Sequence, residues 1–357
     1  MAINSTEIKP QLPVSQIKAM LAEAHLGELE QIQPVRIEAS TRRYFRIHVR
    51  QSGRQYLLCE GLPKPYHDQD GFIQLNAFLE KNGITVPRIH AVNRMEGALL
   101  LSDGGSNDLT DFLNHCDRDD SESQTKRIAA LQTALGLVAR IQRLEPPSLV
   151  ASRLFDFEKL DFEMQYLYTA LDACCQTLQI PDPASYELKY FLTELCKRLA
   201  GAGEFVICHR DFHGRNLIYQ KDPAADLVLI DFQDARMGLP FYDVASLLYD
   251  PYTALTAAER ETLLLWFTEQ LPAEHRPGCK WFYLIAAQRV LKALGTYLNQ
   301  IYNNGNATYL ASVPSALRNL EDITQRGHLP DSLYHFGQHC QVHLIPRLSE
   351  LLPVQQQ

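Results

Sequence analysis

Residues 209–216 read His-Arg-Asp-Phe-His-Gly-Arg-Asn, and this run decides what the rest of the chain can be. It places Asp211 five positions before Asn216. Twenty residues after the first Asp, Asp231 follows a short apolar run rich in β-branched residues, residues 226–230. Such a run predicts a strand, and the polar, proline-containing residues before it predict a turn. The predicted order is therefore strand, loop, strand, turn, strand and carboxylate.

This spacing meets the requirements of phosphoryl transfer from ATP, in which catalysis is mostly positioning and charge neutralisation. A base must face the acceptor hydroxyl, and Asp211 suits that role. Mg²⁺ takes oxygen ligands, which Asn216 and Asp231 can supply. Each residue alone is common by chance. The three together at these offsets, with strands in the right places, predict a phosphotransferase that uses ATP and Mg²⁺.

Two further residues near this run are predicted to support it. His209 lies two positions before the predicted base and is expected to brace the loop through its ring. Asp243 precedes an apolar helical run, residues 244–248, so a helix cap is the simplest interpretation. The alternative is that its carboxylate accepts backbone N–H groups of the catalytic loop. Both roles can hold at once.

The run and its surroundings resemble the aminoglycoside phosphotransferase family, small-molecule kinases that share the protein-kinase fold. Within that family the similarity is greatest to the bacterial anomeric kinases of N-acetylmuramate and N-acetylglucosamine. The resemblance extends over about residues 37–314. The segments that carry it are residues 42–46, 208–217, 230–235, 242–250 and 288–295.

The resemblance implies an α+β, two-lobed protein-kinase-like fold, with a small β-rich N-terminal lobe and a larger, mainly helical C-terminal lobe. It also implies transfer of the ATP γ-phosphate to the anomeric hydroxyl of an N-acetylated amino sugar in cell-wall recycling. Asp211 would be the base, with Asn216 and Asp231 on Mg²⁺. The motif spacing alone does not select the sugar. An aminoglycoside, a choline-like amine and other small alcohols therefore stay open as acceptors.

The N-terminal part lacks two features of protein kinases. The candidate strand at residues 55–60 has no Lys to reach the phosphates, and no Gly-x-Gly-x-x-Gly loop precedes it. Instead we predict a nucleotide site at Ser40, Thr41 and Arg43, because a guanidinium binds phosphate bidentately. A neighbouring arginine could take that role, and a solvated strand edge is the alternative. The absent lysine is the one feature that favours an inactive nucleotide-binding scaffold.

Apolar spacing predicts two lobes, residues 1–104 and 105–357, with a hinge at about residues 101–105. By analogy with the fold, adenine is expected to bond to backbone around Leu101 and Asp103. Predicted elements of the first lobe are helices at residues 14–26 and 70–79 and strands at 35–38, 44–49, 56–60 and 98–101. Helices of the second lobe are predicted at residues 109–113, 126–144, 155–171, 186–199, 257–270, 281–302 and 313–323.

The acceptor has to reach Asp211, so the catalytic loop and the helical lobe are expected to form its pocket. Gln288 and Arg289 are included because of the family resemblance, and a solvated helix face is the alternative for both. Lys292 shares their helix face. Arg215 could stabilise charge on the transferred phosphoryl group, and Asp234 could instead shape a turn. The predicted acceptor-binding residues are His213, Arg215, Gln233, Asp234, Gln288 and Arg289.

Composition bounds the remaining possibilities. The chain has 357 residues, 46% of them apolar, and a formal net charge of −8, without a basic stripe for nucleic acid. Residues 1–104 hold 12 Lys+Arg and 11 Asp+Glu, so the remaining residues carry a net charge of −9. This negative charge of the C-terminal part is mildly favourable for a cationic acceptor. No leader or membrane-length apolar run is evident. Eight scattered Cys favour reduced thiols in a cytoplasm. The expected partner is a small-molecule hydroxyl acceptor, with neither nucleic acid nor membrane.

Three histidines, His335, His339 and His343, recur every four residues near the C-terminus. On one helix face they could bind Zn²⁺ or Ni²⁺. Gly337 weakens that helix, and a histidine-bearing surface face is the more common outcome.

Overall fold

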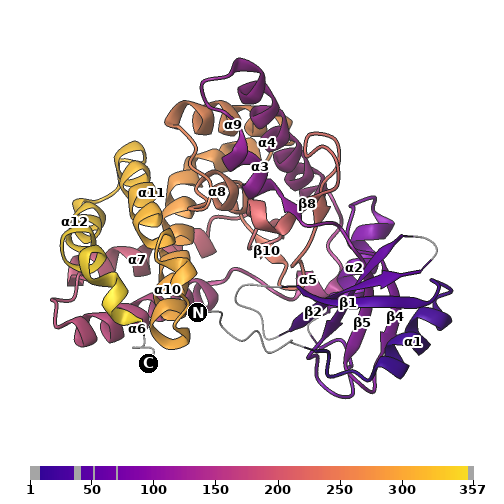
Figure 1. Ribbon diagram of the computed structural model, residues 1–357. Helices are drawn as coiled ribbons and strands as arrows, with labels where there is room; N and C mark the ends of the chain where they lie inside the picture. Colours follow the sequence, from indigo (N-terminus) through magenta and orange to yellow (C-terminus); the bar gives the residue numbers. More distant parts are fainter. Residues whose placement is uncertain (1–8, 36–41, 51–52, 70, 353–357) are drawn as a thin grey trace. The chain divides into compact units, whose positions relative to one another are not determined.

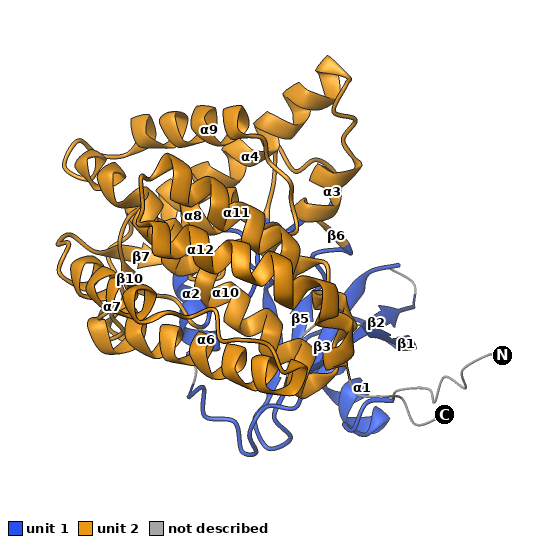
Figure 2. Cartoon of the chain, turned by 90° about the vertical axis from the view of Figure 1, so that its left-hand side faces the viewer, with its two compact units in different colours: residues 1–106, 218–220, 228–233 blue, residues 107–217, 221–227, 234–357 orange. Residues whose placement is uncertain are grey.

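The computed structural model describes residues 9–35, 42–50, 53–69 and 71–352. Two compact units divide the chain, as Figure 2 shows. Unit 1 comprises residues 1–106, 218–220 and 228–233, and unit 2 comprises residues 107–217, 221–227 and 234–357. The division therefore follows Ser106, and two later segments return to unit 1.

Unit 1 is built on an antiparallel sheet of five strands in the order β1-β2-β3-β5-β4. In β2 every second residue, Phe45, Ile47 and Val49, is buried, as expected for a strand with one face on a core. Helix α1 adds Ile17, Met20 and Leu21 to that core. The elements are α1 (Val14–Glu23), β1 (Leu29–Val35), β2 (Arg43–Val49), β3 (Gln55–Glu60), α2 (Phe72–Lys81), β4 (Ile89–Asn93) and β5 (Ala98–Ser102).

Most of the elements predicted for unit 1 are present with shifted ends, and one strand was misplaced. The strand predicted at residues 35–38 is instead β1, and residues 36–38 lie outside the described part of the chain. Pro34 argues against a strand because proline cannot donate to a ladder. β1 is an edge strand, where that loss is tolerated. β4 was not predicted.

Unit 2 is mainly helical, and α10 runs through its centre against α6, α8 and α11 (Figure 1). A Cβ on Gly295 of α10 would lie 2.8 Å from Leu167 Cα of α6, so glycine permits this close crossing. The elements are β6 (Asn107–Asp108), α3 (Leu109–His115), α4 (Ser121–Gln142), α5 (Ser148–Ala151), α6 (Phe157–Leu178), α7 (Tyr186–Ala200), β7 (Val206–Cys208), β10 (Arg236–Gly238), α8 (Tyr242–Leu248), α9 (Ala257–Gln270), α10 (Phe282–Asn304), α11 (Ser312–Arg326) and α12 (Asp331–His339).

The predicted helices of this unit are all present, and the one at residues 257–270 has the predicted bounds. A small antiparallel sheet and a larger helical part confirm the predicted α+β class. Two short strands that follow the predicted catalytic loop, β8 (Leu217–Tyr219) and β9 (Val228–Leu229), are adjacent. Within the described ranges, no helix is both long and apolar enough to cross a membrane. All eight cysteines are free thiols.

The three C-terminal histidines do not share one regular helix face. α12 ends at His339, and a π-helical turn at Cys340–Leu344 follows it. The rings of His339 and His343 lie 4.5 Å apart, and His339 Nε2 lies 3.1 Å from the Pro181 carbonyl oxygen. Across the part of the chain that the structure describes, no cluster of three or more His, Cys, Asp or Glu side chains is suited to hold a metal.

Candidate active site

The predicted catalytic loop of unit 2 begins where the buried strand β7 ends. Arg210 has a left-handed backbone, with φ of 84°, which is uncommon for a residue other than glycine. A 3₁₀ turn at Gly214–Asn216 closes the loop. A Cβ on Gly214 would lie 2.7 Å from the backbone nitrogen of Thr110, so only glycine lets the loop pack this closely on the start of α3.

Asp243 holds the first half of this loop. Its carboxylate is 1% exposed and accepts the backbone N–H groups of His209, at 2.7 Å, and Arg210, at 2.9 Å. Burial raises the pKa of the Asp243 carboxyl against these bonds. The residue lies inside the first turn of α8, and the N-cap position belongs to Phe241. The helix-cap interpretation is thus wrong, and the alternative geometry is the one present.

His209 packs inside the same loop. It is 2% exposed, and its ring meets the Phe212 ring edge-on at 5.8 Å.

The Asp211 carboxylate is held by one of its two oxygens. Oδ1 accepts from Lys292 Nζ at 2.7 Å and from Arg289 Nη2 at 3.2 Å, both on α10. No residue of the described ranges donates to Oδ2, and the side chain is 27% exposed. Burial alone would raise the pKa of this carboxyl, but the cations of Lys292, Arg289 and Arg210 outweigh it and hold the pKa well below its usual range.

Asn216 is oriented by the loop itself. Its Nδ2 donates to the Asp211 carbonyl at 2.9 Å and lies 3.4 Å from His213 Nε2. The amide oxygen accepts no hydrogen bond from the residues described, so it is available to a hard cation. Burial lowers the pKa of His213 to about 3, which keeps its ring neutral near pH 7.

Asp231 belongs to unit 1, where it follows β9. It is exposed and has a left-handed backbone, with φ of 62°. Its neighbour Phe232 is buried and stacks on Phe72 with the ring centres 5.1 Å apart, which anchors the segment. Gln233, predicted to contact the acceptor, donates from Nε2 to Asp231 Oδ1 at 2.7 Å and so steadies that carboxylate.

The predicted nucleotide-binding residues of unit 1 have mixed outcomes. Ser40 and Thr41 lie outside the described residues. Arg43 Nη2 lies 2.5 Å from Glu60 Oε1, which engages its guanidinium within the protein. The Asp103 carboxylate is 5% exposed and pairs with Arg46, so it braces this segment. Leu101 is buried within β5, between β3 and β4.

The predicted acceptor-binding residues of unit 2 also differ in what they offer. The Arg215 guanidinium lies 3.7 Å from the centre of the Tyr252 ring. Asp234 is 59% exposed on its side chain and pairs with Arg210 at 3.0 Å. Gln288 is fully buried and donates to Glu163 Oε2 at 2.9 Å, so it has no surface to offer an acceptor.

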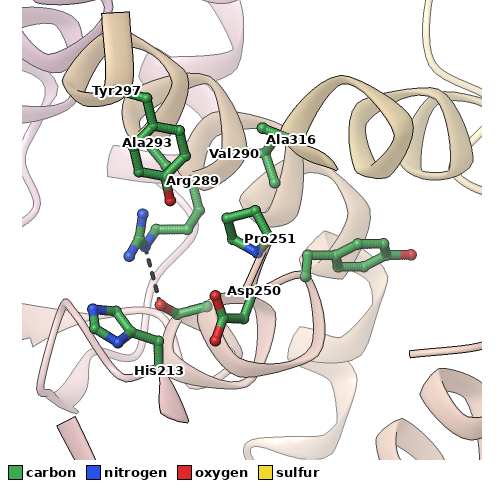
Figure 3. A pocket seen from close by; sticks show the side chains of 10 residues that line it. His213, Asp250, Pro251, Arg289, Val290, Ala293, Tyr297 and Ala316 are labelled. Atoms are coloured by element: carbon green, nitrogen blue, oxygen red, sulfur yellow. Dashed lines mark hydrogen bonds between the residues drawn. The ribbon is translucent and has the colours of Figure 1, made fainter. Parts of the chain in front are cut away.

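A small cavity lies beside Arg289, as Figure 3 shows. Polar side chains of His213, Asp250, Arg289 and Tyr297 line it, and Arg289 Nε donates to Ser246 at 3.1 Å. Its volume of about 10 Å³ has room for about one water molecule. It is therefore too small for a sugar.

Glu163 of α6 is the residue that the sequence interpretation missed. It is 3% exposed and accepts from Gln288 at 2.9 Å and from Arg210 at 3.1 Å. A signal was present, since Glu163 lies three residues after Leu160 and four before Leu167, both buried, and so interrupts the apolar face of a helix. A carboxylate in that position needs partners, and here they are Gln288 and Arg210.

Asp250 offers a test of the electrostatics of this region by pH. Burial raises its pKa from 3.8 to about 6. Between those two pH values the Asp250 carboxyl is protonated to a greater extent in the folded chain than in the unfolded chain. The contribution of Asp250 to the free energy of unfolding therefore falls as pH rises. We expect the free energy of unfolding of the wild type, relative to Asp250→Asn, to decrease from pH 4 to pH 6.5 and then level off. Urea unfolding at a series of pH values measures it.

The exposed Asp226 supplies the control for that measurement, as Asp226→Asn. Parallel stability curves for the wild type and Asp250→Asn over this pH range would contradict the expectation.

Residues 31–279 match the model of the phosphotransferase enzyme family, and the chain belongs to that family. Among curated proteins, it is 27% identical over 300 residues to the N-acetylmuramate/N-acetylglucosamine kinase of Pseudomonas aeruginosa, covering 82% of this chain and 83% of that one. The predicted enzyme class, a phosphotransferase with an alcohol group as acceptor, is confirmed.

Solved structures show the same fold at low sequence identity. The choline kinase LicA of Streptococcus pneumoniae matches with a TM-score of 0.55 at 16% identity, over 87% of this chain and 99% of that one. An ADP-bound aminoglycoside phosphotransferase matches with a TM-score of 0.54 at 15% identity, over the same shares. The predicted kinase-like fold is confirmed by these neighbours.

Proposed function

We propose that the chain transfers the γ-phosphate of ATP to the anomeric hydroxyl of N-acetylmuramate or N-acetylglucosamine, in the recycling of cell-wall sugars. The observation that carries the kinase assignment is the Asp211 carboxylate, which has one oxygen held while the other has no donor among the described residues. The choice of acceptor is supported by the names of the curated relatives.

In this proposal Asp211 Oδ2 accepts a hydrogen bond from the acceptor hydroxyl, orients its oxygen and takes its proton as transfer proceeds. Asn216 and Asp231 fit Mg²⁺, because both present oxygen atoms and the amide nitrogen of Asn216 is already engaged. Bound Mg²⁺ would neutralise charge on the phosphates. The backbone around Leu101 and Asp103 would meet the adenine.

The electrostatics of Asp211 favour an acidic acceptor hydroxyl. A carboxylate whose pKa is held well below its usual range is a weak base. The anomeric hydroxyl of a sugar is more acidic than its other hydroxyls because the ring oxygen withdraws electron density. A weak base therefore suits the anomeric position better than an ordinary alcohol.

The same cations argue against a positively charged acceptor. Lys292 and Arg289 contact Asp211 directly, and Arg210 adds a third positive charge nearby. Placing an ammonium or an aminoglycoside against them would add like-charge repulsion. The negative charge of the C-terminal part as a whole is thus a poor guide to the site itself.

We place the reaction in the cytoplasm, which is consistent with eight free thiols.

ATP turnover with Mg²⁺ against a panel of acceptors tests the proposal, with phosphorus NMR on each product. The panel contains N-acetylmuramate, N-acetylglucosamine, kanamycin, choline and glucose. We expect a sugar 1-phosphate from the N-acetyl sugars. Phosphorylation of kanamycin or choline alone would retain the kinase and reject the sugar. ATP binding without turnover on any acceptor would favour the scaffold.

A further inference from the structure

We infer that Lys292 is a positioning residue for phosphoryl transfer, which together with Arg289 clamps one oxygen of Asp211 and directs the other to the acceptor hydroxyl. The inference rests on the proposed role of Asp211. It adds a residue of α10, far from the catalytic loop in sequence, to the machinery of the reaction.

The geometry of the clamp is one-sided. Lys292 Nζ and Arg289 Nη2 both donate to Asp211 Oδ1, at 2.7 and 3.2 Å. Arginine paired with a carboxylate commonly forms two parallel hydrogen bonds, one to each oxygen. Arg289 instead donates from Nε to Ser246 Oγ at 3.1 Å, and its guanidinium reaches a single oxygen of Asp211. One oxygen of Asp211 is left without a protein donor in the described ranges.

Both cations are fixed by burial. The side chains of Lys292 and Arg289 are 13% and 9% exposed, and they lie one helical turn apart. Their helix is held against α6 by the close contact at Gly295. A clamp on a rigid, buried helix restricts the carboxylate far more than a flexible surface lysine would.

A second carboxylate balances the positive charge behind the clamp. Glu163 of α6 accepts from Gln288 and Arg210, and Lys159 Nζ lies 3.6 Å from it. The charged groups that act on Lys292 are therefore the carboxylates of Asp211 and Glu163 and the guanidinium groups of Arg289 and Arg210.

Stability alone does not explain this arrangement. Removing a lysine from water is costly, and a well-packed apolar residue is often as stabilising as a buried ion pair. Here the carboxylate is 27% exposed, and its unclamped oxygen accepts from no donor among the residues that the structure describes.

Lys292→Met is the first variant. We expect it to lower kcat by about 100-fold with little change in the KM of the acceptor, because a misplaced carboxylate costs rate rather than binding. Lys292→Arg should recover at least part of that loss. In Lys292→Ala, added propylammonium should restore activity in a saturable way by replacing the missing ammonium.

Lys159→Met is the matched control, since it removes a partly buried lysine near Glu163 that does not contact Asp211. It should keep kcat within about threefold of the wild type. Circular dichroism and ATP binding confirm that each variant is folded.

ATP hydrolysis without acceptor is measured in parallel, because water then takes the acceptor's place and no knowledge of the sugar is needed. If the wild type phosphorylates no sugar, the proposed acceptor fails, while hydrolysis still reports on the clamp. The clamp is overturned if Lys292→Met keeps wild-type rates in both assays. Equal losses in Lys292→Met and Lys159→Met, without rescue by the amine, would also overturn it.

Discussion

Asp211→Asn is expected to lower kcat by about 10²–10⁴-fold while ATP binding is retained. The amide oxygen of the new side chain can replace Oδ1 and accept from Lys292 and Arg289. Its NH₂ group then faces the substrate hydroxyl. That hydroxyl needs an oxygen to accept its hydrogen bond and meets a donor instead. An amide also cannot take the proton.

Single-turnover and steady-state rates measure this effect, and calorimetric titration measures ATP binding separately. Asp226→Asn, at an exposed position of unit 2, is the control for the loss of one carboxylate. If Asp211→Asn kept more than about a tenth of the wild-type kcat, Asp211 would not be the base. If the wild type bound ATP without turnover and Asp211→Asn left that binding unchanged, the chain would act as a nucleotide-binding scaffold.

Asp243→Ala should remove about 2–6 kcal/mol from the free energy of unfolding, because two backbone N–H groups, one buried and one partly buried, lose their acceptor at about 1–3 kcal/mol each. The groups belong to His209 and Arg210, at 2.7 and 2.9 Å from the carboxylate. Arg210 has a left-handed backbone that these bonds help to hold. Its release would also displace Asp211, the next residue, so activity should fall with stability.

Urea unfolding of the wild type, Asp243→Ala and the exposed control Asp226→Ala gives the three free energies. Asp243→Asn adds a sharper comparison, because its amide can accept one of the two N–H bonds and should lose less than alanine does. A stability for Asp243→Ala within about 0.5 kcal/mol of the wild type would show that the loop keeps its shape without this carboxylate.

Several elements of the fold were predictable because local patterns and tertiary structure agree. Strand β2 alternates buried and part-exposed residues, and α9 has a complete capping box at Thr256 and Glu259. β1 was misplaced because its apolar residues, Leu29 and Ile32, do not alternate strictly and a proline, Pro34, follows them within the strand.

The arrangement of the predicted catalytic loop was readable from the sequence because Asp211 and Asn216 lie five positions apart, and a loop of that length places both by its own backbone. Their shared hydrogen bond, from Asn216 Nδ2 to the Asp211 carbonyl, is local. The offset of Asp231 from a strand end was equally local. For these residues, spacing along the chain carries the positional information.

The environment of Asp211 was decided only by the tertiary structure. Lys292 is 81 positions away along the chain and Arg289 is 78. Whether their helix face meets solvent or a carboxylate depends on how α10 packs on α6 and α8, which no local pattern encodes. The buried Glu163 marks the same limit. The sequence determined the spacing of the groups that we propose do the chemistry. Long-range packing determined which charges surround them and which oxygen of Asp211 has no donor in the described part of the chain.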